Sequence, residues 1–136
     1  MTQEDKELLL KDLSSRLPYN VKVNEEIQGD FTLLGIVEDR VITNCNCEYK
    51  YNDFPIELIK PYLRPMYSMT EEEKNEFESL GWRVDELDDN MPWNHNSYNV
   101  FDGVDWLTKN MFDYRGLIPM GLALKASEGM YNIKEK

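Results

Sequence analysis

The fold is decided by the stretch VKVNEEIQGDFTLLGIVEDRVITNCNCEYKY at residues 21–51. It holds four short segments with the composition of strands, separated by polar residues that favour turns: 21–27, 31–37, 41–45 and 47–51. Several short strands joined by tight turns are typical of a small antiparallel sheet. Closure of this sheet into a barrel is left open by the pattern.

A helix is predicted on the N-terminal side of this stretch, over residues 3–16. Thr2 is placed to cap it, and Asp5 puts a negative charge in its first turn. Its leucines recur at helical spacing, which predicts one buried side: Leu9, Leu10, Leu13 and Leu17.

Two more helices are predicted on the C-terminal side. The proline-rich segment 54–66 excludes a regular helix and leaves room for one last short strand around residues 56–59. Thr70 and Glu73 then have the spacing of a capping box, and Gly81 is placed to end that helix. Asp102 is predicted to cap the third helix, whose apolar stripe is Val104, Leu107 and Met111.

Length and composition agree with one domain of the α+β class. The chain has 136 residues, of which 41% are hydrophobic and 30% charged, so it can bury a core without metals or disulfides. We expect a single compact domain over residues 1–126: an N-terminal helix, a small antiparallel sheet and two helices. Residues 127–136 are expected to form a frayed tail.

The charge excludes some classes of partner. There are 26 acidic and 15 basic residues, a net charge of −11, and no basic stripe for nucleic acid or an anionic membrane. No signal peptide or membrane-spanning run is recognisable, and Cys45 and Cys47 do not resemble a secreted disulfide framework. A cytoplasmic protein is therefore expected.

The sequence fits no catalytic or cofactor-binding pattern. The single histidine, His95, lies in a polar segment, and together with Cys45 and Cys47 it gives at most three zinc ligands. The acidic run 85–90 lacks the glycine and glutamate of a calcium-binding EF-hand loop. No phosphate-binding glycine loop or nucleophile elbow occurs. We therefore predict no catalytic residue, no metal ligand and no cofactor.

One segment has the composition of a protein-binding surface. Residues 67–90 contain nine acidic and two basic residues, a net charge of −7. Aromatic side chains are frequent in and just after it, and exposed aromatics often mark interfaces. The predicted contact residues are Trp82, Asp88, Asp89, Trp93 and Tyr98, with Phe101 close by. Packing of these rings under a loop is the alternative.

A second pair of segments carries opposite charges. Tyr62-Leu63-Arg64 and Asp113-Tyr114-Arg115 are far apart in the sequence. Asp113 could pair with Arg64 or Arg115 and dock the C-terminal part onto the proline-rich segment. An architectural role is favoured over a ligand site.

Three blocks together carry a resemblance: LLLKDLSSRLP at 8–18, IKPYLRPMYSMTEEE at 59–73 and FDYRGLIPMGLAL at 112–124. The set resembles a family of short uncharacterised proteins from gut bacterial genomes and their phages or other mobile elements. The resemblance implies a compact cytoplasmic protein linked to such elements, and it implies no activity, cofactor or catalytic residue.

The function expected from these observations is that of a non-enzymatic accessory protein that binds another protein. The alternative is a metal-dependent hydrolase that uses Asp85, Asp88, Asp89 and Asp102. A structural component of an oligomer is a third possibility, because the sequence leaves the oligomeric state open.

Overall fold

The structure is a computed structural model that describes residues 1–44, 52–83, 93–94 and 100–131. The predicted strand at 47–51 and residues 132–136, half of the predicted tail, lie outside the described residues. The chain divides into two compact units, which we call the first and second unit. The first comprises Met1–Tyr62 with Gly121–Leu124, and the second Leu63–Met120 with Lys125–Lys136. This division does not test the prediction of one domain, which stays a prediction.

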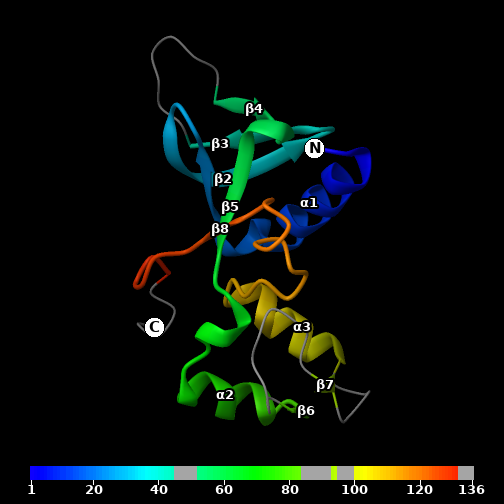
Figure 1. The fold of residues 1–136 in the computed structure, drawn as a ribbon, viewed down its shortest axis with the longest axis vertical. Coiled ribbons are helices and arrows are strands. Elements are labelled where there is room, and N and C mark those ends of the chain that lie inside the picture. The colour runs from blue at the N-terminus through cyan, green and yellow to red at the C-terminus, as the bar shows by residue number, and fades with distance from the viewer. Residues whose placement is uncertain (45–51, 84–92, 95–99, 132–136) are drawn as a thin grey trace. The chain divides into compact units, whose positions relative to one another are not determined.

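Helix α1 confirms the N-terminal prediction, since it spans Gln3–Arg16 (Figure 1). The Thr2 hydroxyl accepts a hydrogen bond from the Asp5 amide at 3.0 Å, and the Asp5 carboxylate accepts one from the Thr2 amide at 3.3 Å. This reciprocal capping box supplies acceptors for amides that a helix leaves free at its start. The helix ends in a short 3-10 turn, after which Asn20 adopts a left-handed conformation.

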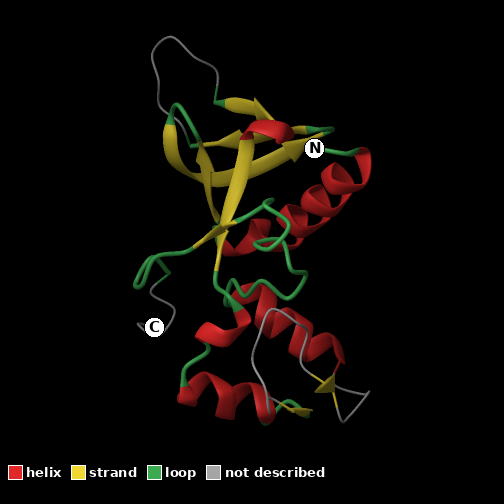
Figure 2. Ribbon diagram, viewed as in Figure 1, coloured by secondary structure: helices red, strands yellow, loops and turns green. Residues whose placement is uncertain are grey.

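Six strands form a mainly antiparallel open sheet in the order β4-β3-β2-β1-β5-β8 (Figure 2). Their bounds are β1 Lys22–Glu25, β2 Gly29–Val37, β3 Arg40–Thr43, β4 Asp53–Pro55, β5 Ile59–Leu63 and β8 Leu124–Lys125. The predicted α+β class is thereby confirmed. Among the described residues the sheet ends at β4 and β8 and does not close, so the barrel alternative is wrong.

Alternate residues of β1, β3 and β5 are buried, as in a sheet that packs one face against a core. Val23 lies opposite Phe31, and Val41 lies opposite both Ile36 and Phe54 in the neighbouring strands. The core of the first unit contains side chains from α1 and from the strands: Leu9, Leu13, Val21, Val23, Leu33, Val41, Phe54, Ile56 and Ile59.

The proline-rich segment differs from its prediction. Ile56–Leu58 forms a 3-10 turn instead of a strand, and β5 follows it as Ile59–Leu63. Pro61 lies inside this strand opposite Val23. Proline interrupts helices, but its fixed φ suits extended backbone and costs a strand only one donor.

The second unit contains two helices and a short hairpin. Helix α2 spans Glu71–Glu78, and helix α3 spans Val100–Lys109. The predicted capping box at Thr70 is present. Asp102 does not cap α3, because the helix begins two residues earlier and Asp102 falls in its first turn. Strands β6 (Trp82–Arg83) and β7 (Trp93–Asn94) pair antiparallel within a segment that the sequence shows as irregular.

None of the helices among the described residues is both long enough and apolar enough to cross a membrane.

Candidate functional site

A row of stacked aromatic rings fills the core of the second unit. The ring centroid of Phe77 on α2 lies 5.1 Å from that of Trp82 and 5.1 Å from that of Trp106. Trp106 in turn lies 5.7 Å from Phe112. Met66, Met69 and Leu107 complete this core. Aromatic stacking adds to the large area that these rings remove from water, so the row holds α2 and α3 together.

Trp82 is the first of the predicted contact residues, and its position differs from the prediction. Only 6% of the residue is exposed, so the expectation that its ring faces outward is wrong. Gly103 on α3 makes room for the indole: a Cβ added there would overlap the indole nitrogen. The indole N–H has no hydrogen-bond acceptor among the described residues. The sequence allowed both an exposed and a packed Trp82 ring, and it could not distinguish between them.

The other predicted contact residues are only partly located. The backbone of Trp93 lies in β7 opposite Arg83. Asp88, Asp89 and Tyr98 lie outside the described residues. The binding role of these residues is untested and stays a prediction.

Helix α3 presents an outward face that carries an aromatic ring and two carboxylates. Phe101 is 80% exposed, and Asp102 and Asp105 are exposed as well. We call these three residues the α3 face. Single exposed apolar side chains are common on protein surfaces, and Ile27 of the first unit is 83% exposed, but Phe101 is an aromatic ring, a type of side chain that is enriched at interfaces. The sequence pointed to this stretch through Phe101, although Phe101 was not among the five chosen residues.

The neighbouring helix α2 adds negative charge to the surface of the second unit. The Trp106 indole N–H donates a hydrogen bond to the Glu76 carboxylate at 2.9 Å, so α2 and α3 meet at this point. Four glutamates of α2 are exposed: Glu71, Glu72, Glu76 and Glu78. The two helices therefore combine anionic surface with one exposed ring.

Arg64 is the main polar centre inside the second unit. Its guanidinium donates two hydrogen bonds to the Glu73 carboxylate, at 2.7 and 2.8 Å, and one to the Asn110 carbonyl at 3.3 Å. The guanidinium carbon also lies 4.2 Å from the centroid of the Phe112 ring. Such a two-bond contact fixes geometry more strictly than a single bond. Arg64 thus links the segment after β5 to the start of α2 and the turn after α3.

The same contact explains the acidity of Glu73. Burial by itself raises the pKa of this carboxyl, but hydrogen bonds from Arg64 and from the Thr70 backbone outweigh it. The pKa of Glu73 therefore lies below its ordinary value.

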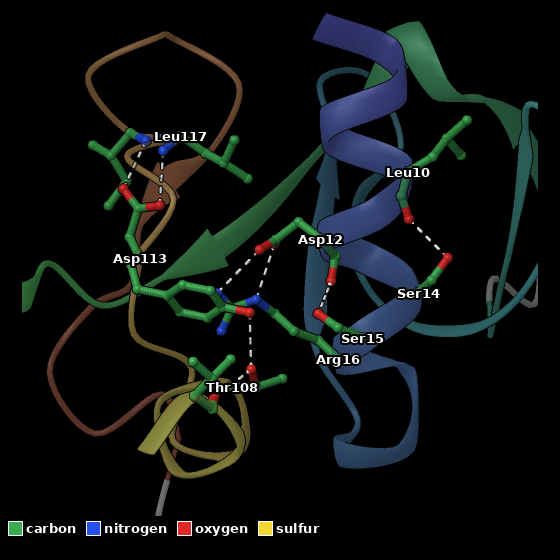
Figure 3. Close-up of polar contacts among 11 residues, drawn as sticks. Leu10, Asp12, Ser14, Ser15, Arg16, Thr108, Asp113 and Leu117 are labelled. Atoms are coloured by element: carbon green, nitrogen blue, oxygen red, sulfur yellow. Dashed lines mark hydrogen bonds and ion pairs between the residues drawn. The ribbon is translucent and has the colours of Figure 1, made fainter. Parts of the chain in front are cut away.

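The expected contact between the two charged segments exists, with chemistry that differs from the prediction. The Arg64 amide donates to the Met111 carbonyl at 2.7 Å, and the Asp113 amide donates to the Arg64 carbonyl at 2.8 Å. Arg64 forms its ion pair with Glu73 instead of Asp113. The Asp113 carboxylate accepts bonds from the amides of Leu117 and Ile118, at 2.7 and 2.9 Å (Figure 3). It therefore fixes the turn that follows it.

The first unit contains a buried ion pair that sequence reasoning missed. Arg16 donates from Nε and Nη2 to the two oxygens of Asp12, at 2.9 and 3.2 Å, and both side chains have no exposed area (Figure 3). Their spacing of four residues on α1 was a usable signal. A prediction based on the spacing of apolar residues misses this ion pair, because it places charged residues on the solvent-exposed side of the helix.

Most residues of the metal-dependent alternative lie outside the described residues. Within the described ranges, no group of three or more His, Cys, Asp or Glu side chains could hold a metal ion. Asp102 is exposed on α3, while Asp85, Asp88 and Asp89 lie outside those ranges, as do Cys45, Cys47 and His95. The hydrolase alternative and the predicted absence of metals and cofactors are not tested by this finding.

Comparison of the chain with models of protein families, with curated proteins and with solved structures finds no match. The resemblance to short proteins of gut bacteria and their phages is therefore still a prediction.

Proposed function

We propose that this protein is a non-enzymatic accessory protein of the cytoplasm that acts by binding another protein through the second unit. The observation that carries the proposal is the exposed ring of Phe101 on the α3 face. An aromatic side chain at the centre of an interface buries a large area and loses little conformational freedom. A link to phages or other mobile elements remains part of the proposal through the sequence resemblance.

The charge of the surrounding surface supports a macromolecular partner. Asp102 and Asp105 lie on the same helix as the ring, and α2, which meets α3 through Glu76 and Trp106, carries four exposed glutamates. This surface would repel nucleic acids and anionic lipids, since both are bound through Lys and Arg. A protein with a complementary positive surface would be attracted to it.

The test is a crosslinking experiment in cells that make the protein. A photoreactive phenylalanine analogue is placed at Phe101, and in a matched control at Leu34, which is 56% exposed in β2 of the first unit. We expect a discrete crosslinked protein from position 101 only. Equal crosslinks from both positions, or none from position 101, would contradict the proposal.

A second measurement separates binding from folding. Phe101→Ala removes an exposed side chain, so the free energy of unfolding should change by no more than about 0.5 kcal/mol. Unlabelled wild-type protein should compete with the labelled protein and abolish the crosslink, whereas unlabelled Phe101→Ala protein should not. This result would identify the Phe101 ring as a contact.

A further inference from the structure

We propose that the α3 face binds an arginine side chain of the partner protein, with the guanidinium on the Phe101 ring and against the carboxylates of Asp102 and Asp105. This inference rests on the proposed function and names the chemistry of the partner. It predicts a preference for arginine over lysine that a merely acidic surface would not have.

Within the α3 face, Asp105 is the residue that neighbours each of the other two on the helix surface. Asp105 follows Phe101 by four residues and Asp102 by three, and residues at both spacings lie side by side on a helix. Within the described part of the chain, neither aspartate forms an ion pair, and Lys109, one turn further, pairs with neither of them. Asp105 therefore lies beside both the Phe101 ring and the Asp102 carboxylate on the helix surface.

This combination of groups suits a guanidinium. The face of an aromatic ring attracts a cation, and arginine stacks on it through its planar group. The same group donates several hydrogen bonds in a fixed fork, which carboxylates accept. A lysine ammonium is a compact, strongly hydrated charge and gains less from the ring.

The second unit contains the same arrangement inside its own structure. There Arg64 lies 4.2 Å from the centroid of the Phe112 ring and donates two hydrogen bonds to Glu73. The ring, carboxylate and guanidinium of this internal contact correspond in kind to the groups proposed at the α3 face, where the arginine would come from the partner.

The net charge of the chain favours a cationic segment of a partner over a second copy of this chain. The whole chain carries a net charge of −11, and exposed glutamates of α2 lie beside α3. A second copy of this chain would meet this surface with like charge, whereas a cationic segment would be drawn to it.

The probe is a pair of short peptides that differ only in carrying arginines or lysines at the same positions. Their affinities for the full chain are measured by calorimetry at low and at physiological salt. We expect the arginine peptide to bind about two- to fivefold more tightly, the range that a solvent-exposed cation–π contact gives. Phe101→Leu keeps an apolar side chain without a ring face, and it should abolish this preference.

Two further variants separate the carboxylates from general charge. Asp105→Asn should weaken the binding of both peptides, while Glu4→Gln removes one exposed charge from α1 of the first unit and should leave the affinity unchanged. Equal affinity of the two peptides for the wild-type protein would overturn the inference, as would a preference that survives Phe101→Leu. If position 101 crosslinks to a partner but the two peptides bind equally, the proposed function is retained and only the inferred preference for arginine is rejected.

Discussion

The two compact units each hold an arginine in a two-bond contact with a carboxylate, but the first pair is fully buried, the second is partly exposed, and the two connect different lengths of chain. Asp12 and Arg16 lie one turn apart on α1. Arg64 and Glu73 join an extended segment to the first turn of a helix. The first pair can form as soon as α1 forms, whereas the second requires the second unit to be folded. The same chemistry thus stabilises a helix in one unit and tertiary structure in the other.

The largest effect is expected from Asp12→Ala in the first unit. This change removes the carboxylate that accepts two hydrogen bonds from the buried Arg16 guanidinium, and removing one partner of a buried pair costs about 3–5 kcal/mol of unfolding free energy. Urea unfolding followed by far-UV circular dichroism measures the loss. The double replacement Asp12→Leu with Arg16→Met serves as the control and should recover most of it. A loss below about 1 kcal/mol for Asp12→Ala, the size of a surface pair, would show that the pair is not buried in solution.

Arg64→Ala should have a smaller effect, because this pair retains some exposure to solvent. We expect a loss of about 2–3 kcal/mol from the unpaired Glu73 carboxylate and the lost contact with Phe112. All three tryptophans lie in the second unit, at 82, 93 and 106, so their fluorescence reports on this unit directly. Arg64→Lys keeps the charge but not the fork, and its stability should fall between those of Arg64→Ala and the wild type. An Arg64→Ala protein as stable as the wild type would contradict the assigned role.

The Arg64–Glu73 pair also predicts a dependence on pH. Since the folded pKa of Glu73 lies below its ordinary value of 4.5, its stabilising contribution is complete above that pH and is lost as the pH falls through the folded pKa. Glu73→Gln should therefore unfold with a shallower dependence on pH below about 4.5 than the wild type does. Unfolding free energies measured from pH 6 downward test this. Asn75→Ser, a change at an exposed position of the same helix that removes no titratable group, is the control and should keep the wild-type slope.

These pairs also show what the sequence could and could not predict. Both capping boxes are local patterns of side chains three residues apart, and both were predictable. The partner of Arg64 was not, because Glu73, Asp113 and other carboxylates all suit a guanidinium and only the folded backbone chooses among them. Trp82 and Phe101 show the same limit at the candidate site. An aromatic residue in this stretch can belong to an interface or to a core. The burial of Trp82 depends on the space at Gly103, which is a property of helix packing and not of the local sequence.

The space at Gly103 gives a prediction of intermediate size. Gly103→Ala improves the intrinsic helix propensity but drives a methyl group into the Trp82 indole, and overpacking of this kind costs about 1–3 kcal/mol. The tryptophan emission should shift to the red as an indole moves toward water. Gly35→Ala in β2 is the matched control, because its added Cβ would approach no closer than 3.8 Å to Ile42. It should be neutral or slightly stabilising. Equal effects of the two substitutions would contradict the packing of Trp82 on α3.

The two capping threonines give the smallest effects and the sharpest comparison of the units. Thr2→Ala and Thr70→Ala should each cost about 1 kcal/mol of unfolding free energy. The capping box at Thr70 uses Glu73, whose carboxylate accepts from the Thr70 amide at 2.9 Å and from Arg64 at 2.7 Å. Thr70→Ala and Arg64→Ala should therefore be non-additive, with an interaction energy of about 0.5 kcal/mol or more.

Thr2→Ala shares no such carboxylate with Arg64, so its effect should add to that of Arg64→Ala within about 0.5 kcal/mol. Double-mutant cycles on both pairs, followed by circular dichroism and by tryptophan fluorescence, measure the two interaction energies. Coincident transitions from the two probes would support the prediction of one cooperative domain. Additivity at Thr70 would mean that Glu73 caps α2 equally well without Arg64, and the ion pair would then act apart from the helix it adjoins.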